Sequence, residues 1–109
     1  MKRTTLIGAA LTGMTLALAV PAHADGDAAK GKVKAISCMG CHGIPGYHNA
    51  YPNYPVPRVG GQYPEYIVAA LKAYKSGQRN HPTMQAQAAT LSDQDMQDIA
   101  VYFASAPGQ

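Results

Sequence analysis

Residues Cys38-Met39-Gly40-Cys41-His42 carry the pattern C-x-x-C-H, and the fold of the whole chain depends on what this pattern binds. Cys38 and Cys41 are the only two cysteines. Residues three positions apart on a helix share a face, so both thiols can bond the vinyl-derived carbons along one edge of a porphyrin. His42 then lies beneath the ring with a nitrogen directed at the iron. The pattern therefore predicts one covalently attached haem, haem c.

Three other uses of the two cysteines compete with haem attachment. A thioredoxin-like redox pair is expected beside a βαβ pattern, and the sequence shows no convincing strand. A zinc ion needs four ligands, and it would have to combine the thiols with scattered histidines such as His48 and His81. A structural disulfide suits an oxidising compartment, but it gives His42 no role. Haem attachment is the interpretation that uses all three reactive residues of the motif.

The first 24 residues have the pattern of a secretory signal peptide. Lys2 and Arg3 form its positive start, and an apolar stretch follows from Leu6 to Val20. This stretch of about 15 residues is shorter than the roughly 20 that span a bilayer, and an A-x-A ending follows it. We therefore expect cleavage after Ala24, export to the periplasm, and no integral membrane segment in the remaining chain.

Residues 25–109 are expected to form a single domain. A chain this short builds a marginal core and usually needs reinforcement, which the large apolar faces of a haem would provide. Without the signal peptide, seven basic and six acidic side chains remain. This near balance gives no indication of a nucleic-acid partner and little support for attraction to acidic partners.

The helical patterns predict an all-α domain, with three main helices and a short one wrapped around the haem. We expect the first helix to begin near Asp25 or Asp27, either of which could cap it, and to run toward Cys38. Its apolar stripe is predicted from residues at helical spacing. These residues are Ala29, Val33 and Ile36.

Capping signals define the second and third helices more closely. The second is expected from Pro64, which suits the first helical position, to Ser76, with Gly77 ending it. The third begins after Ser92, with Asp95 at the reciprocal capping position. The predicted buried stripes are Ile67, Leu71 and Tyr74 in the second helix, and Met96, Ile99, Ala100 and Phe103 in the third.

The segment from Gly43 to Gly61 is predicted to be a long loop rich in tyrosine and proline. Four prolines and four glycines interrupt it, which disfavours a long helix or a central strand. Its tyrosines combine an apolar face with a hydroxyl, so they suit a loop laid over a haem edge, although plain packing explains each of them equally well. We assign one of them, Tyr47, to the cofactor site.

A second axial ligand for the haem iron is expected opposite His42. Met39 lies inside the attachment motif, on the wrong side of the ring, and Met96 belongs to the stripe of the third helix. Met84 remains, in a stretch that Pro82 is expected to hold extended or turn-like. A methionine in this position suits the far face of the haem. His81 is the rival ligand, and it would give a bis-histidine site.

In order along the chain, these residues resemble those of the bacterial monohaem class I c-type cytochromes, of the cytochrome c4 and c553 kind. The resemblance covers almost all of residues 27–106. It rests on Cys38-Met39-Gly40-Cys41-His42-Gly43, Gly60-Gly61-Gln62, Tyr66, Leu71, Gly77-Gln78-Arg79, Met84, Leu91-Ser92-Asp93-Gln94-Asp95 and Tyr102. It implies the family's small cytochrome c fold and its role, the transfer of single electrons between larger redox proteins.

The same resemblance implies that the backbone carbonyl of Pro57 accepts a hydrogen bond from His42. We also assign the neighbouring Arg58 to the cofactor site. The expected protein is an electron carrier and not an enzyme, with redox proteins as donor and acceptor. One alternative is a peroxidase or gas sensor with an open or bis-histidine iron, in which His81 and Arg79 would act. Another is an electron-transfer subunit of a dehydrogenase or oxidase.

Overall fold

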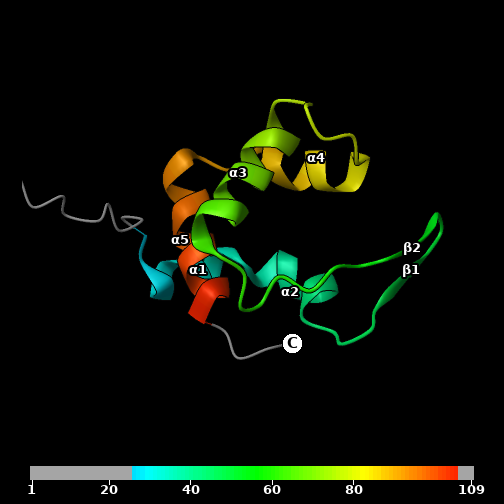
Figure 1. Cartoon of the computed structure of the whole chain (residues 1–109), viewed down its shortest axis with the longest axis horizontal. Coiled ribbons are helices and arrows are strands. Elements are labelled where there is room, and N and C mark those ends of the chain that lie inside the picture. Colours follow the sequence, from blue (N-terminus) through cyan, green and yellow to red (C-terminus); the bar gives the residue numbers. More distant parts are fainter. Residues whose placement is uncertain (1–25, 106–109) are drawn as a thin grey trace, which may run out of the picture.

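The computed structural model describes residues 26–105 as five helices and one β-hairpin (Figure 1). The predicted signal peptide lies outside these residues. Within them, no helix is both long enough and apolar enough to cross a membrane. The elements are α1 (Ala28–Lys34), α2 (Ile36–His42), β1 (His48–Ala50), β2 (Asn53–Pro55), α3 (Pro64–Lys75), α4 (Pro82–Ala89) and α5 (Asp93–Ser105). The predicted all-α fold is confirmed, with a small hairpin added to it.

Helix α1 begins where the Asp27 carboxylate accepts the backbone N–H groups of Ala29 and Lys30. This arrangement satisfies donors that the first turn of a helix leaves without intrahelical partners. The expected single helix toward Cys38 is divided at Ala35, where the backbone leaves the helical region. Helix α2 resumes at Ile36 and carries the C-x-x-C-H motif to its last residue.

The predicted apolar stripe of the first helix is wrong. Val33 is 66% exposed and Ile36 is 69% exposed, and Ala29 also faces solvent. The buried residues are instead Gly31 and Ala35. A Cβ atom at Gly31 would lie 1.9 Å from the backbone oxygen of Asp98, so α1 packs on α5 through its smallest side chain. Close backbone approach, and not apolar side chains, determines which face of α1 is buried.

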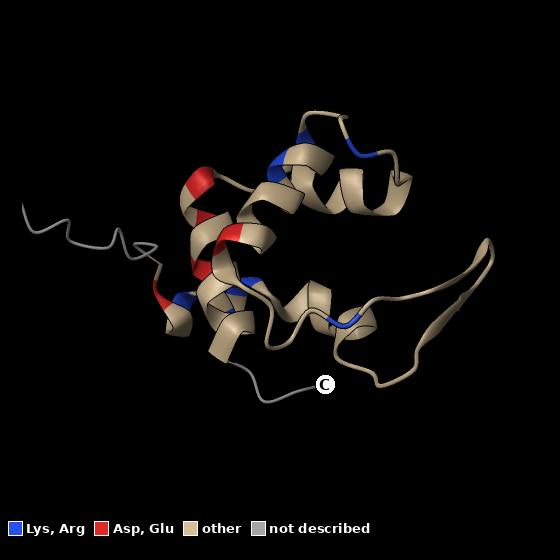
Figure 2. Cartoon of the chain, in the orientation of Figure 1, with Lys and Arg blue, Asp and Glu red and all other residues tan. Residues whose placement is uncertain are grey.

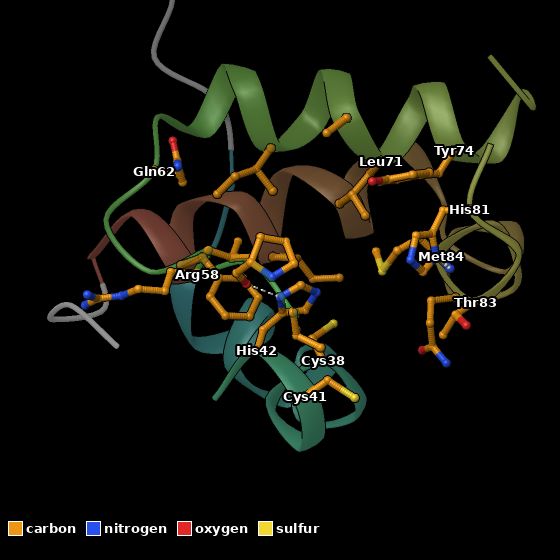
Figure 3. Close-up of a pocket in the computed structure, with 18 of the residues that line it drawn as sticks. Cys38, Cys41, His42, Arg58, Gln62, Leu71, Tyr74, His81, Thr83 and Met84 are labelled. Carbon is orange, nitrogen blue, oxygen red and sulfur yellow. Dashed lines mark hydrogen bonds between the residues drawn. The ribbon is translucent and has the colours of Figure 1, made fainter. Parts of the chain in front are cut away.

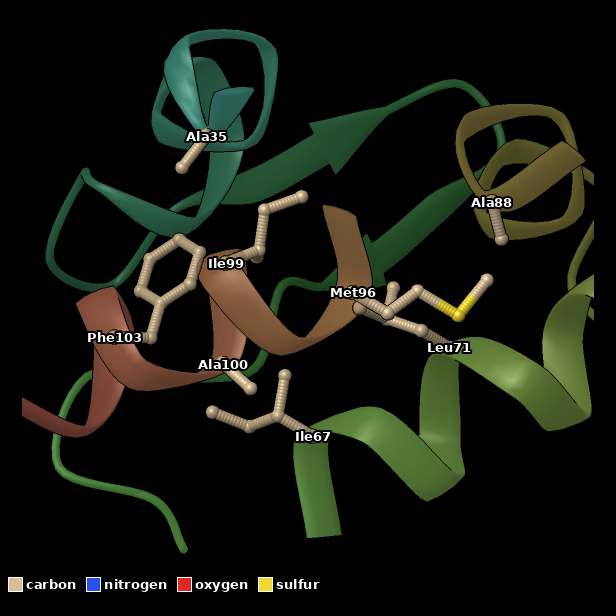
Figure 4. Packing of buried hydrophobic residues seen from close by; sticks show 8 residues of the cluster. All are labelled: Ala35, Ile67, Leu71, Ala88, Met96, Ile99, Ala100 and Phe103. Atoms are coloured by element: carbon tan, nitrogen blue, oxygen red, sulfur yellow. The ribbon is translucent and has the colours of Figure 1, made fainter. Parts of the chain in front are cut away.

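The hydrophobic core lies between α3 and α5 (Figure 4). Helix α3 contributes Ile67 and Leu71, both predicted, while Tyr74 is only partly buried beside them. Helix α5 contributes the four residues of its predicted stripe, all of them buried. Ala35 and Ala88 complete the cluster from the flanking helices. The core is small, and it leaves one side of α3 and α5 facing a cavity.

The ends of α3 and α5 follow the predicted capping patterns. Pro64 is the first residue of α3, Ser76 is its C-cap, and Gly77 follows with φ +80°. Glycine adopts this left-handed conformation without steric cost. At the start of α5, the Ser92 N–H donates to the Asp95 carboxylate (2.9 Å), and the Asp95 N–H donates to the Ser92 hydroxyl (3.1 Å). This is the reciprocal capping box that the sequence predicted.

Two segments differ from the sequence prediction. Residues 79–84 were expected to be extended or turn-like; His81 is extended (φ −157°, ψ 99°), but Pro82 is the first residue of α4. Proline restricts the residue before it and suits a helix start, so the same signal fits both structures. The expected loop from Gly43 to Gly61 contains the β1–β2 hairpin, which projects from the helical body (Figure 1).

Candidate cofactor site

A cavity of about 400 Å³ lies between α2, α3, α4, α5 and the β2 end of the hairpin. Most of its lining is apolar, and it includes core residues of α3 and α5. Every residue of the predicted iron-binding set and both cysteines line it as well (Figure 3). An apolar cavity with a few polar groups aimed into it is typical of a cofactor site.

Helix α2 positions the attachment residues at one edge of this cavity. Cys38 and Cys41 are one helical turn apart, both thiols are free, and both side chains are partly buried. Burial raises the pKa of the Cys38 thiol above its ordinary value, although hydrogen bonds from Ser37 and from its own backbone act in the opposite direction. Because both cysteines line the cavity from one turn of α2, they lie along one edge of it, as covalent attachment of a porphyrin requires.

The orientation of the His42 ring is set by a hydrogen bond to Pro57. Its Nδ1 lies 2.7 Å from the Pro57 backbone oxygen. A carbonyl oxygen only accepts, so Nδ1 carries the proton and donates. In the neutral imidazole, the other ring nitrogen, Nε2, then carries no proton and is available as a metal ligand. The contact that the resemblance implied is present, and it selects the tautomer that can bind iron.

Met84 enters the cavity from the opposite side to His42 (Figure 3). It lies in the first turn of α4, and its side chain is partly buried. His81 also lines the cavity, and its Nδ1 accepts the Met84 backbone N–H at 3.4 Å. The imidazole of His42 and the thioether of Met84 thus lie on opposite sides of an apolar space. Histidine and methionine are the ligand pair of many electron-transfer haems.

The charged side chains that line the cavity are all basic. They are Lys34, Arg58 and Arg79, and no Asp or Glu is among the lining residues. Lys34 is paired with Asp95. Figure 2 shows the acidic residues on α5, at the start of α3 and beside α1, away from α2, α4 and the hairpin. Haem carries two carboxylates, so a cavity with basic side chains and no carboxylate fits its charge.

The structure brings together most of the predicted site but not all of it. Arg58 and Pro57 line the cavity, whereas Tyr47 does not. The Tyr47 carbonyl instead accepts the Val56 N–H at 2.9 Å and closes the base of the hairpin. Tyr54 and Tyr66 line the cavity, although the sequence analysis assigned only Tyr47 to the site. In the hairpin, Tyr54 pairs with Asn49, and this register places its side chain toward the cavity.

The competing uses of the cysteines find little support in the same geometry. Across residues 26–105, no group of three or more His, Cys, Asp and Glu side chains is arranged to hold a metal ion. The two described strands form an antiparallel hairpin and not a βαβ unit. Neither a zinc site nor a thioredoxin-like pair fits this arrangement.

Comparison with known proteins agrees with the cavity and its motif. The cytochrome c family model matches residues 28–107. The chain belongs to the cytochrome c family. It is 45% identical over 92 residues to cytochrome c4 of Pseudomonas aeruginosa, covering 84% of this chain and 44% of that protein. It is 43% identical over 83 residues to cytochrome c-554(548) of Halomonas halodenitrificans, covering 73% of this chain and 96% of that protein.

Solved structures show the same relationship. The chain aligns with reduced recombinant cytochrome c4 from Pseudomonas stutzeri with a TM-score of 0.63 and 34% identity, over 77% of this chain and 47% of that one. The chain spans about half the length of the cytochrome c4 relatives it matches. The predicted cytochrome c fold and the family resemblance are confirmed, and as a member of this family the protein carries covalently attached haem c.

Proposed function

We propose that this cytochrome c is an exported one-electron carrier whose haem iron is bound by His42 and Met84. The observation that carries the proposal is the imidazole of His42 facing the thioether of Met84 across an apolar cavity. Cys38 and Cys41 supply the covalent attachment at the cavity edge, and Pro57 holds the His42 ring. By the pattern of its first 24 residues, the protein is exported to the periplasm and works there as one domain from residue 25 to residue 109.

Bound haem would supply an iron that gains and loses one electron. His42 and Met84 would hold the iron from two sides of the cavity, so the same two side chains would bind it in both oxidation states. Pro57 keeps the Nε2 atom of His42 directed at the metal, and the hydrogen bond raises its basicity. The apolar walls from α3 and α5 exclude water. With both faces occupied, no substrate needs to reach the iron, so the proposed role is electron transfer and not catalysis.

The alternative of an open or bis-histidine iron has less support. A peroxidase would need His81 and Arg79 free to act over the iron. Here His81 Nδ1 accepts the Met84 N–H, and the Arg79 guanidinium lies 4.5 Å from the centre of the Tyr74 ring. Both side chains are therefore engaged in holding the wall of the cavity, while the Met84 thioether enters it.

The partners are proposed to be redox proteins that meet the molecule briefly. Contacts of this kind usually bury less than about 1,200 Å² in total. A relative named cytochrome subunit of sulfide dehydrogenase, from Chlorobaculum tepidum, is 34% identical over 74 residues and covers 68% of this chain. The protein could thus also transfer electrons as a fixed subunit of a larger enzyme.

The ligand assignment is tested by the visible spectrum of the ferric protein. A weak far-red band reports coordination of iron by a thioether, and we expect it in the wild type. Met84→Ala should abolish the band, whereas His81→Ala should retain it. Met39→Leu is the control, because Met39 is also partly buried against the core but does not line the cavity. A high-spin ferric spectrum in the wild type would contradict the proposal and favour an open iron.

A further inference from the structure

The β1–β2 hairpin reaches across the cavity to the start of α4. The Tyr54 ring meets the His81 ring edge-on, with centroids 4.8 Å apart and planes at 85°. The Tyr54 hydroxyl also donates to the Thr83 hydroxyl oxygen at 3.4 Å. Elsewhere the hairpin is largely exposed, and Tyr51 near its tip is 95% exposed. The contact with α4 is therefore made by one side chain of β2.

His81 connects this contact to Met84. It is the N-cap of α4, and its Nδ1 accepts the backbone N–H of Met84 at 3.4 Å. Its ring lies between Tyr54 of the hairpin and Tyr74 of α3, whose centroid is 6.3 Å away at 75°. Edge-to-face rings at these separations attract each other. A chain of contacts thus runs from the hairpin through His81 to the backbone of Met84.

Apart from the partly buried Met84 side chain, which packs against the core, the first turn of α4 contains no buried residue. The helix packs on α3, and its one buried residue is Ala88, near the opposite end. Its first turn contains Met84 but no acidic side chain to complement the helix dipole. The position of Met84 therefore depends on its own packing against the core and on the His81 cap, together with the side chains that hold His81.

We propose that the hairpin is a brace for the sixth iron ligand, in which Tyr54 and His81 are positioning residues that hold Met84 against the iron. The proposal rests on the His42/Met84 ligation proposed above. Met84 belongs to the turn that His81 caps, so the contacts of His81 would favour the position of α4 from which the Met84 thioether can hold the iron. Removing the brace therefore raises the fraction of molecules in which the iron is open.

Cyanide binding to the ferric holoprotein measures this fraction, because cyanide takes the position that Met84 leaves. A helix cap and an aromatic pair are each worth enough to change an equilibrium about fivefold. We expect Tyr54→Ala and His81→Ala each to raise the apparent cyanide association constant about fivefold. Tyr54→Phe keeps the ring and should match the wild type. His81→Asn restores a cap acceptor, so its cyanide association constant should lie between those of His81→Ala and the wild type.

Tyr51→Ala is the control, since this tyrosine belongs to the same hairpin but is almost fully exposed. It should bind cyanide as the wild type does. Equal cyanide affinity in Tyr54→Ala, His81→Ala and the wild type would overturn the brace. If the wild type still shows the far-red band, the proposed ligation by Met84 stands. Absence of that band from the wild type would instead overturn the ligation, and the brace with it. Tyr54→Leu repeats the test with a bulkier side chain if Tyr54→Ala loses its helical circular dichroism.

Discussion

Gly31 determines how α1 packs against α5. The space that a methyl group would need is occupied by the backbone of α5, with the Asp98 oxygen 1.9 Å from the position of the missing Cβ. Backbone atoms do not move aside as side chains do. The exposed Val33 and Ile36 follow from this approach, because the face that carries Gly31 and Ala35 must turn inward.

We predict that Gly31→Ala destabilises the protein by at least about 1–3 kcal/mol, the usual cost of overpacking a core. Gly40→Ala is the matched control, because a Cβ there meets nothing within 4 Å. Alanine is the better helix former by about 1 kcal/mol, so the control should be neutral or stabilising. Guanidinium unfolding of both holoproteins measures the difference. Similar midpoints for the two variants would show that α1 does not depend on this contact.

Asp98 is the one buried charged residue among those described, with 1% of its surface exposed. Its carboxylate accepts the Asp27 backbone N–H and the Gln94 side-chain N–H, each at 2.9 Å. These hydrogen bonds hold the pKa of Asp98 below its ordinary value. The carboxylate therefore links α5 to the start of α1 in its charged form.

At the scale of the elements, α3 and α5 could be predicted from sequence because their signals are local. Pro64, Gly77 and the Ser92–Asp95 pair act on neighbouring backbone atoms and need no tertiary context. The buried face of α1 could not be predicted, since Gly31 is buried by contact with the backbone of Asp98, more than sixty residues away in the sequence. Periodicity counts apolar side chains, and here a glycine makes the contact.

The cofactor site also contains parts that could be predicted from the sequence and parts that could not. That Cys38, Cys41 and His42 lie together at the cavity could be predicted because they are close in sequence, and Met84 was selected only by elimination. The place of the short helix α4 and the presence of the hairpin were missed, since their prolines indicate breaks as readily as starts. The position of Tyr54 depends on strand register, which three-residue strands do not reveal in sequence.

The capping box of α5 yields an element-scale prediction. Ser92→Ala removes the acceptor of the Asp95 N–H and should destabilise the protein by about 1 kcal/mol. Ser76→Ala is the control, because the Ser76 hydroxyl donates to the Ala73 carbonyl at the exposed C-terminal end of α3 and caps no N–H. Denaturant midpoints at neutral pH compare them. An equal effect of both substitutions would contradict the importance of the N-terminal cap.

At the scale of the whole molecule, the contact between α1 and α5 is sensitive to acid. The pKa of Asp95 is lowered to about 2, chiefly by its hydrogen bond with Lys34 and then by Ser92, and the pKa of Asp98 is also lowered. A carboxylate with a lowered folded-state pKa stabilises the fold above its unfolded value near 3.8. That contribution is lost as the pH falls toward the folded value.

We therefore predict that Lys34→Met moves the midpoint of acid unfolding to higher pH. The lysine holds the Asp95 carboxylate in its charged form, so without it the proton binds earlier. Lys32→Met, a change at an exposed lysine of the same helix, is the control for lost charge. Soret absorbance and helical circular dichroism followed from pH 6 to about pH 2 locate the midpoint. A shift of the same size in the control would assign the effect to net charge alone.

The final prediction concerns the dependence of the whole fold on haem. Without haem, the apolar side chains of α3 and α5 that line the cavity of about 400 Å³ are exposed to water, at a cost of about 25 cal/mol for each Å² of apolar surface. Domains of this size are stable by only about 5–10 kcal/mol. Cys38→Ala/Cys41→Ala should therefore lose most of its helical circular dichroism when no haem is retained. Cys38→Ser should stay folded, because Cys41, His42 and Met84 still hold the ring. A native-like spectrum for the haem-free double variant would mean that α3 and α5 collapse onto α2 without the cofactor.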